Sequence, residues 1–338
     1  MSKIDYRAAG VDIDAGNETV RRIKALARAT YTPGVVSGVG SFGGLFALDS
    51  AIESPVLVAS ADGVGTKLKV AFLAGVHETI GADLVNHCVN DILVQGARPL
   101  FFLDYLATGR LAPDVAEQVV RGMSEACRAN GCALLGGETA EMPGFYAPGE
   151  YDVAGFIVGV VSRSKIVDGR GVVPGDALIA LPSSGLHTNG YSLARRIAFD
   201  VLKLGVDSEV EELGETVGQA LLRPHRSYLH EVLPVLDKGW IKGMAHITGG
   251  GITENLPRTL PDGCGFSLDR QSWAIPPLFA WLQRAGQLDD AEMFRTFNMG
   301  VGLILVCAPA HAAALASALG PDAWLLGRVG DGSVFHRS

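Results

Sequence analysis

Short apolar runs alternate with longer segments of helical periodicity through most of the chain. Runs rich in β-branched residues predict strands, and in the first half we expect them at Pro55 to Ser60, Leu100 to Leu106, Cys132 to Leu135 and Val153 to Val161. Apolar residues near helical spacing predict a helix over Pro113 to Asn130, with Gly131 as its C-terminal cap. This alternation is typical of an α/β (mixed α+β) fold.

The second half repeats the mixture after a segment rich in Gly, Pro and charge. That segment, Lys165 to Asp176, predicts a boundary between domains of residues 1–168 and 169–338. Beyond it we expect strands at Ala177 to Leu181, Met244 to Thr248 and Val301 to Cys307, and helices at Tyr191 to Leu202, Arg226 to Leu236 and Pro276 to Ala285. The most membrane-like window, Val301 to Gly320, is interpreted as a buried strand followed by an Ala-rich helix that starts at Pro309.

Composition adds expectations about size and partners. A chain of 338 residues exceeds the roughly 100 to 200 residues of one typical domain, which favours two. Hydrophobic residues make up 48% and charged residues 19%, so we expect an additional buried surface, such as the interface of a homodimer. The net charge of −8 and the lack of any Lys/Arg block argue against nucleic acid and membrane surfaces as partners and favour small molecules.

Cysteine usage and the N-terminus indicate the compartment. The five cysteines are scattered and form no C-x-x-C pair, which predicts neither disulfides nor a zinc site. The segment MSKIDYRAAG has no apolar stretch of the kind found in secretory signals. We therefore expect a cytoplasmic protein.

Candidate chemistry begins at PVLVASADGVGTK, Pro55 to Lys67, where a strand-like run leads into a Gly-rich turn. Asp62 can supply hard oxygen ligands to Mg²⁺, Gly63 and Gly65 allow close approach of phosphates, and Lys67 offers them a positive charge. The alternative is an ordinary Asp-Gly turn with a surface lysine.

The segment Glu78 to Gly96 predicts a helix with an unusual polar arc. The arc holds short polar side chains and no Lys, Arg or Glu: Asp83, Asn86, His87, Asn90 and Asp91. A solvent-facing helix surface normally uses long residues that favour both helix and water. We therefore expect the arc to face a site, with Asp91 as metal ligand, and keep plain solvent exposure as the alternative.

A third segment, LGGETAEMP, also leads from a predicted strand into glycines and then carboxylates. We expect Glu138 to join Asp62 and Asp91 around one magnesium ion, because clustered carboxylates neutralise phosphate charge during phosphoryl transfer. Gly137 and Thr139 flank it.

Two glycine-rich turns in the second half, SSGLHTNGYSLARR and HITGGGITENLPR, precede helical segments whose free N–H groups suit a phosphate. In the first, His187 and Asn189 are candidates for proton transfer or amide recognition. The alternative is a pair of connecting loops with a hydrogen-bonded histidine.

Other ligand-binding motifs are matched only in part or not at all. GVGSFG, Gly38 to Gly43, matches G-x-G-x-x-G but lacks the following helix, so we interpret it as a mobile loop that covers phosphates. Asp12 and Asp14 imitate a calcium loop, yet Ile23 stands where the bidentate Glu belongs. The chain contains no Walker-type G-x-x-x-x-G-K-[ST].

Motifs along essentially the whole chain resemble the phosphoribosylformylglycinamidine cyclo-ligases, the aminoimidazole ribonucleotide synthetases of purine biosynthesis. They are AGVDIDAGN, DGVGTK, VNDILVQGA, FFLDYLATG, LGGETAEMPG, YDVAGFIVG, SSGLHTNGYSL, HITGGGITENLPR and RTFNMGVG. The resemblance implies an ATP-dependent enzyme with a two-domain synthetase-superfamily fold, an N-terminal domain whose sheet forms a dimer interface, and a C-terminal α/β domain.

The family activity would be ring closure of formylglycinamidine ribonucleotide, by phosphorylation of its formamide oxygen and attack of the amidine nitrogen. The match implies ATP and Mg²⁺ as cofactors and assigns Asp62, Asp91 and Glu138 to the metal. Asp62, Asp91 and His187 would be catalytic. Assigned to the nucleotide are Lys24, Gly63, Gly65, Thr66, Lys67, Asn90, Gly137 and Thr139. Assigned to the substrate are Ser183, Ser184, Gly185, Asn189, Thr248, Gly249 and Gly250. Ser60-Ala61 replaces a Gly-Thr expected in many relatives, which puts a role for the preceding hydroxyl in doubt.

Other functions stay open as alternatives. Among ATP users of this superfamily, a selenophosphate synthetase needs an early reactive Cys, and a hydrogenase-maturation dehydratase needs a terminal Cys; here the first cysteine is Cys88 and the last residue is Ser338. A thiamine phosphate kinase should lack SSGLHTNGYSL and RTFNMGVG. A non-catalytic nucleotide sensor would lose the metal carboxylates, which this chain retains.

Overall fold

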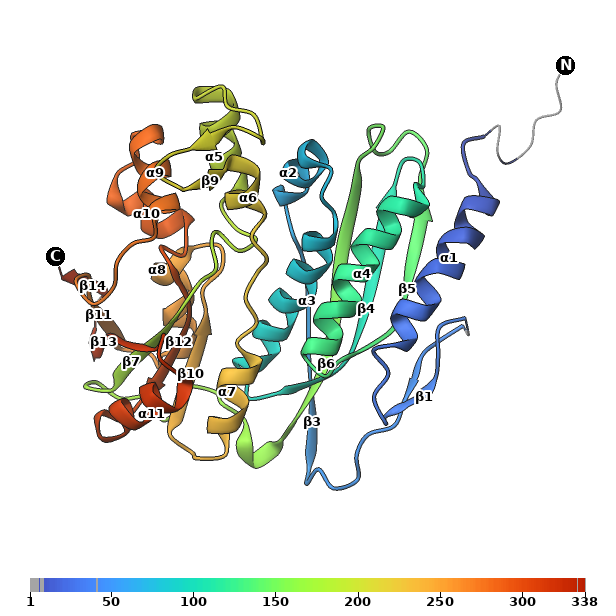
Figure 1. Ribbon diagram of the computed structural model, residues 1–338. Coiled ribbons are helices and arrows are strands. Elements are labelled where there is room, and N and C mark those ends of the chain that lie inside the picture. Colours follow the sequence, from blue (N-terminus) through green and yellow to red (C-terminus); the bar gives the residue numbers. More distant parts are fainter. Residues whose placement is uncertain (1–5, 7–8, 41, 333, 338) are drawn as a thin grey trace, which may run out of the picture.

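Two β-sheets, one in each half of the chain, organise the molecule (Figure 1). This computed structural model describes residues 6, 9–40, 42–332 and 334–337, so most of the N-terminal segment considered above, and part of the GVGSFG loop, lie outside the described residues. The elements of the first half are α1 (Ile13–Arg28), β1 (Val35–Ser37), β2 (Leu45–Phe46), β3 (Pro55–Gly63), α2 (Lys67–Ala74), α3 (Glu78–Leu93), β4 (Arg98–Thr108), α4 (Pro113–Ala129), β5 (Ala133–Glu141), β6 (Tyr151–Ser162) and the 3-10 turn η1 (Arg163–Lys165).

The second half contains a second, larger sheet with helices around it. Its elements are β7 (Ala177–Pro182), α5 (Tyr191–Arg195), the π-helical segment η2 (Arg196–Val201), β8 (Glu209–Val210), β9 (Glu215–Thr216), α6 (Val217–Leu222), α7 (Leu229–Leu236), β10 (Ile241–His246), α8 (Gly251–Asn255), η3 (Leu256–Thr259), β11 (Cys264–Asp269), α9 (Pro277–Gly286), α10 (Asp290–Thr296), β12 (Val301–Cys307), η4 (Pro309–His311), α11 (Ala312–Leu319), β13 (Trp324–Asp331) and β14 (Val334–Arg337). The six strands run in the order β10-β12-β7-β13-β11-β14, and only the β11–β14 pair is parallel.

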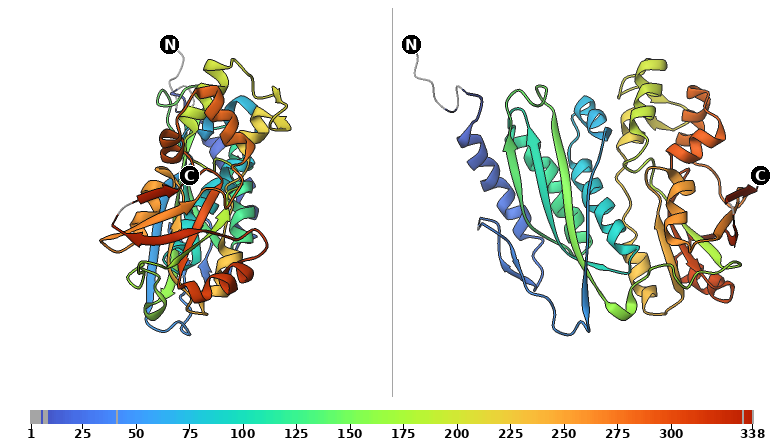
Figure 2. Two further views of the ribbon diagram at one scale, coloured as in Figure 1. Left: turned by 90° about the vertical axis from the view of Figure 1, so that its left-hand side faces the viewer. Right: turned by 180° about the vertical axis from the view of Figure 1, so that it is seen from behind.

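The first sheet has the strand order β3-β6-β4-β5 and one covered face. Helices α3, α4 and α1 lie on that face, whereas the view from behind shows strands with no helix in front of them (Figure 2). Leu57 and Phe156 are 61% and 45% exposed, as expected for apolar residues that alternate away from the covered face. The sheet therefore presents an open, partly apolar surface.

Helices α3 and α4 approach each other closely because glycines lie at their crossing. A Cβ on Gly81 would collide with the backbone of Val119, and one on Gly122 would collide with the carbonyl of Glu78. The buried residues of α3 then reach both α4 and the sheet, which holds this helix rigidly at the centre of the molecule.

The predicted elements are found, but two strands extend further than expected. β5 continues through Gly137 to Glu141, so the second Gly-rich segment is strand. β3 continues through Asp62 to Gly63, and the turn predicted after it is found at Gly65 and Thr66, before α2. Tertiary pairing is the reason: Asp62 pairs with Gly155 on β6 and Gly137 pairs with Asp104 on β4. A Cβ on Gly137 would collide with the Asp104 carboxylate, which explains why glycine suits this position without any ligand.

The predicted end of α4 and the predicted absence of disulfides are also confirmed, whereas α7 begins at Leu229 and not at Arg226. Helix α4 ends before Gly131, whose φ of +61° belongs to the left-handed region that favours glycine. All five cysteines are free thiols. Among the described residues, no helix combines the length and apolar character that crossing a bilayer requires. The division at residue 168 stays a prediction.

Candidate active site

A cavity of about 710 Å³ lies between the two halves, and residues from both line it. From the first half come Ser60 and Asp62 on β3, with His87 and Asp91 on α3. From the second half come His246 at the end of β10, Thr248, Asn255 and Arg258. The carboxylates of Asp62 and Asp91 and the guanidinium of Arg258 thus line one cavity, which suits a ligand that carries both anionic groups and a bound cation.

Asp62 and Asp91 meet at a shared histidine. His87 Nε2 lies 2.7 Å from Asp62 Oδ2 and 3.7 Å from Asp91 Oδ2, while its Nδ1 lies 2.7 Å from the Thr188 hydroxyl. Ser60 donates its hydroxyl to Asp91 Oδ2 at 3.0 Å. The side chains of Asp62 and Asp91 remain 44% and 26% exposed, so both carboxylates can still accept a ligand.

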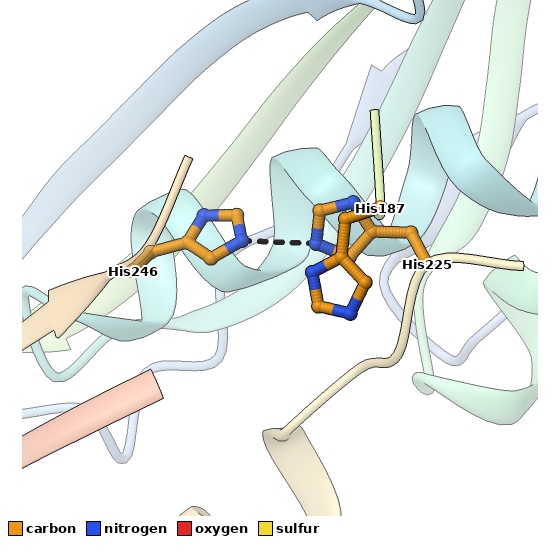
Figure 3. Close-up of side chains that lie close together, drawn as sticks. All are labelled: His187, His225 and His246. Atoms are coloured by element: carbon orange, nitrogen blue, oxygen red, sulfur yellow. Dashed lines mark hydrogen bonds between the residues drawn. The ribbon is translucent and has the colours of Figure 1, made fainter. Parts of the chain in front are cut away.

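A chain of imidazoles continues from Asp91 into the protein interior (Figure 3). His246 Nδ1 lies 2.9 Å from Asp91 Oδ1, and His246 Nε2 lies 2.9 Å from His225 Nε2. The His187 ring stacks on that of His225, with centroids 3.9 Å apart. Because Asp91 can only accept when ionised, we assign the proton of neutral His246 to Nδ1, and His225 then donates to His246 Nε2.

Burial and neighbouring charges divide these histidines into two kinds. Burial would lower the pKa of His87, but the hydrogen bond to Asp62 and the charge of Asp91 outweigh it, so the pKa is raised. Burial lowers the pKa of His246 and holds the pKa values of His187 and His225 well below the ordinary range. Positive charge is therefore favoured at His87, beside the carboxylates, and disfavoured deeper inside.

The pKa values of the two carboxylates are shifted downwards, opposite to that of His87. Burial alone would raise the pKa of Asp62, but the hydrogen bond and charge of His87 keep it below its ordinary value. Burial would also raise the pKa of Asp91, but the hydrogen bond and charge of His246 lower it below its ordinary value. Both groups are ionised at neutral pH.

Most of the polar arc of α3 binds the other half of the protein and not a ligand. Asn86 donates to the carbonyl of His225 at 2.7 Å, and Asn90 donates to the carbonyl of Arg226 at 2.8 Å. The Asn90 side-chain oxygen also accepts from the Tyr228 N–H. Each end of the Asn90 amide thus makes one hydrogen bond to the second half, which leaves one N–H and one oxygen lone pair; its contact with nucleotide stays a prediction.

Lys67 is completely buried, so the alternative of an ordinary surface lysine is wrong. Its ammonium donates to Asp83 at 2.8 Å, to the carbonyl of Arg223 at 2.7 Å and to that of His187 at 3.3 Å. This ion pair joins the two halves. A phosphate contact for Lys67 stays a prediction and would require the ammonium to leave Asp83. Its neighbour Thr66 contacts the Ser192 hydroxyl at 3.0 Å.

Within one chain, the predicted set of three metal carboxylates is not assembled. A row of paired residues crosses the sheet on the covered face, and it consists of Asp62, Gly155, Asp104 and Gly137. Glu138 follows Gly137 and pairs with Tyr105. Because successive side chains of a strand point to opposite faces, Glu138 points to the open face. It also lies on β5, three strands from β3, or roughly 14 Å at the usual strand spacing. Thr139 follows on β5, and Lys24 lies on α1, which packs against β5.

The two second-half loops lie together, but the helices after them are short. A Cβ on Gly249 would lie 3.1 Å from Asn189 Oδ1, and the Asn189 amide nitrogen is buried without a hydrogen-bond partner in the described part of the chain. Helices α5 and α8 have five residues each, so their N-termini offer less dipole than expected. Gly250, with a φ of +92°, is the residue before α8.

The loop before Asn189 surrounds a separate, small cavity. Ser183, Ser184 and Gly185 line about 80 Å³ beside Arg223. The Ser184 N–H donates to His187 Nε2, and His187 has a φ of +61°, a strained conformation for a residue with a side chain. His187 itself is completely buried, so substrate would reach it only after movement of this loop.

Sequence reasoning missed four residues that the structure places at the cavity. His87 belonged to the polar arc without an assigned role, while His246 and Arg258 stood at the two ends of HITGGGITENLPR. Ser60, whose role was in doubt, contacts Asp91. If the alternation of β3 had been continued to Asp62, Ser60 and Asp62 would have been placed on the same face, and Ser60 would have been recognised as a candidate.

Comparison with known proteins agrees with this architecture. Residues 48–161 match the family described as AIR synthase related protein, N-terminal domain, and residues 173–337 match its C-terminal domain. The solved thiamine-monophosphate kinase from Stenotrophomonas maltophilia has a TM-score of 0.70 at 20% identity, covering 94% of this chain and 95% of that one. Hydrogenase maturation protein HypE in complex with ATP has a TM-score of 0.66 at 20% identity, covering 92% and 86%. The fold and the interdomain cavity define a two-domain protein of the AIR synthase related class.

Curated relatives narrow this class. The phosphoribosylformylglycinamidine cyclo-ligase of Trichlorobacter lovleyi is 56% identical over 328 residues, which cover 96% of this chain and 94% of that protein. That of Desulfitobacterium hafniense is 57% identical, covering 90% and 89%. That of Sorangium cellulosum is 55% identical, covering 96% and 95%. This chain belongs to the phosphoribosylformylglycinamidine cyclo-ligase family.

Proposed function

We propose that this protein converts formylglycinamidine ribonucleotide and ATP to 5-aminoimidazole ribonucleotide, ADP and phosphate in de novo purine biosynthesis. The observation that carries the proposal is the 56% identity, over 96% of the chain, with a cyclo-ligase. Free cysteines support a reducing cytoplasm as its location.

The reaction needs a better leaving group than oxide. Transfer of the γ-phosphoryl group to the formamide oxygen makes that oxygen part of a phosphate, and attack by the amidine nitrogen on the same carbon then expels phosphate and closes the ring. The protein must hold both ends of one flexible substrate within reach of each other and of ATP. A cavity lined from both halves, with cationic Arg258 in the same wall as Asp62 and Asp91, supports this arrangement.

Asp62 and Asp91 fit Mg²⁺, because this ion commonly takes one or two carboxylates and completes its shell with waters and phosphate oxygens. When bound there, Mg²⁺ would neutralise charge on the ATP phosphates. The chain's own contribution is to hold the two carboxylates ionised and oriented through His87 and His246.

Substrate contacts are proposed for the paired loops of the second half. The buried Asn189 amide nitrogen lacks a partner among the described residues, so it can donate to a substrate oxygen, and Thr248 lines the main cavity beside it. For His187 we propose a role in positioning substrate after loop movement. The glycines of both loops would allow close approach of the ribose phosphate.

We propose a homodimer formed through the open face of the first sheet. Exposed Leu57 and Phe156 on that face support it, and Glu138 points the same way, so we retain a metal role for Glu138 only in a dimer whose second chain approaches this face. Phe156→Asp should halve the mass measured by light scattering, while Val173→Asp, a control at an exposed valine of the other half, should not.

The activity is tested with purified protein, ATP, Mg²⁺ and formylglycinamidine ribonucleotide. We expect ADP and the aminoimidazole product in equal amounts, and ADP only when substrate is present. Thiamine phosphate serves as the alternative phosphoryl acceptor. ADP formation with thiamine phosphate and none with formylglycinamidine ribonucleotide would replace the proposal by a kinase activity.

A further inference from the structure

The wall of the main cavity carries more nitrogen than a magnesium site needs. Within reach of Asp62 and Asp91 are the ring nitrogens of His87 and His246, and the potential ligand atoms of His87, Asp91 and His246 lie within 4.8 Å of one another. Magnesium prefers oxygen ligands, whereas imidazole nitrogen suits ions such as Mn²⁺, Co²⁺ and Zn²⁺.

We propose that Asp62, His87, Asp91 and His246 form a binding site for a divalent transition ion, which competes with Mg²⁺ for the two carboxylates. This inference shares Asp62 and Asp91 with the proposed function. It does not depend on the identity of the organic substrate.

The separations between the side chains agree with a common ion. Ligand atoms bonded to one ion at about 2.1 Å lie roughly 3 to 4 Å apart. The structure has 2.7 Å between His87 and Asp62, 2.9 Å between His246 and Asp91, and 3.7 Å between His87 and Asp91. Each of these three separations lies in that range or within a few tenths of an ångström of it.

Both imidazoles can also turn a lone pair to the cavity while the second nitrogen of each ring keeps a hydrogen-bond partner. The second nitrogen of His87 faces the Thr188 hydroxyl, which can accept as well as donate. The second nitrogen of His246 faces neutral His225, which can exchange its proton from Nε2 to Nδ1. Each ligand would thus keep a partner behind it, as metal-bound histidines usually do.

The local charge already favours a cation at this place. Two carboxylates, those of Asp62 and Asp91, lie beside His87 and remain partly exposed to the cavity. The deeper trio His187, His225 and His246 is less suitable, because His187 Nε2 already accepts from the Ser184 N–H and because His187 and His225 are buried away from the cavity.

The test measures Zn²⁺ and Mg²⁺ binding by calorimetry on the full chain, without ATP or substrate. The decisive variant is His246→Asn, since an asparagine amide can keep the hydrogen bond to Asp91 but offers no nitrogen lone pair. We expect it to weaken Zn²⁺ binding roughly tenfold or more and to leave Mg²⁺ binding unchanged. His230→Asn, at an exposed histidine, is the control for surface binding.

A second measurement uses the visible absorption of bound Co²⁺, which reports nitrogen ligation directly and should change in His246→Asn and in His87→Gln. Melting curves establish that the variants fold. If both variants bind Zn²⁺ as the wild type does, or if Zn²⁺ and Mg²⁺ weaken equally, the histidines only position the carboxylates and the proposal is wrong. Since no product is measured, failure here leaves the proposed ring closure untouched, and failure of ring closure leaves this site untouched.

Discussion

The acidic residues of the cavity depend on histidines for their state. Asp62 is oriented by His87 and Asp91 by His246, and the two rings come from different halves of the protein. Each carboxylate accepts from two close donors and therefore retains free lone pairs for a metal or a phosphate-bound ion.

The first prediction concerns Asp62. Asp62→Asn should lower turnover at least about a hundredfold, because it removes a charge that we place on the metal. Its melting temperature should change little, since the side chain is 44% exposed.

The matched control is Asp152→Asn. Asp152 is also exposed on the first sheet and also accepts from the next backbone N–H, at 2.8 Å against 2.7 Å for Asp62. Full turnover in Asp62→Asn would remove Asp62 from the active site.

The second prediction concerns Asp104, which lies under the helices beside Gly137. Burial raises the pKa of Asp104 to about 7 from an ordinary 3.8. A raised folded-state pKa contributes stability that is fully present below about 3.8 and is lost as pH rises through about 7. Asp104→Asn mimics the protonated form, so it should gain about 1 to 3 kcal/mol on the wild type between pH 5 and pH 8.

Urea unfolding at pH 5 and pH 8 measures this gain. We expect a gain in the free energy of unfolding smaller than the value that corresponds to the whole pKa shift, because Asp104 as a residue is only partly buried. An equal difference between wild type and variant at both pH values would show that the carboxyl is not protonated in the folded protein.

Among the elements, α3 connects the sheet, α4 and the second half. Its apolar arc packs inward, and its polar arc is divided between hydrogen bonds to residues 225–228 and the carboxylate site. The position of Asp91 therefore depends on how closely α3 can lie against α4, which the glycines at their crossing determine.

The third prediction follows from that crossing. Gly122→Ala should destabilise the protein by about 1 to 3 kcal/mol, because its Cβ would collide with the rigid carbonyl of Glu78. Gly16→Ala in α1 is the matched control: no atom lies within 4 Å of its added Cβ, so helix propensity alone should stabilise by up to about 1 kcal/mol. Urea unfolding measures both, and a stabilising Gly122→Ala would contradict the close packing.

At the scale of the whole molecule, the two halves are joined by buried polar groups. Lys67 and Asp83 form an ion pair with neither side chain exposed, and the His225 N–H also donates to Asp83 at 2.7 Å. Removing one partner of such a pair lowers the stability strongly, because the remaining charge is buried without compensation. Replacing both partners by apolar residues avoids that penalty.

The fourth prediction tests this joint. Asp83→Ala should cost about 3 to 5 kcal/mol in urea unfolding, since it leaves the Lys67 ammonium unpaired. The double variant Lys67→Met/Asp83→Leu should recover much of that loss. If the double variant loses at least as much stability as Asp83→Ala, the two charges do not depend on each other.

The turnover of the double variant separates the two roles considered for Lys67. If Lys67 only joins the halves, a stable double variant keeps turnover close to that of the wild type. If it contacts phosphate, turnover falls although the protein folds.

The sequence by itself determined the local elements and the chemistry available to them. Periodicity located α4 and its Gly131 cap, and Pro309 separated β12 from the following helix, because these signals depend only on neighbouring residues. The short polar residues of α3 indicated that this helix face meets something other than water, and that inference holds for Asp83, Asn90 and Asp91 alike.

The tertiary structure decided which of those residues share a place. It put Asp62 inside a strand and Lys67 in a buried ion pair, and it separated Glu138 from Asp62 by the width of the sheet. It also brought His246, 155 residues away along the chain, to Asp91. Strand order and the docking of two halves are set by packing between distant segments, so spacing along the chain carries no record of them.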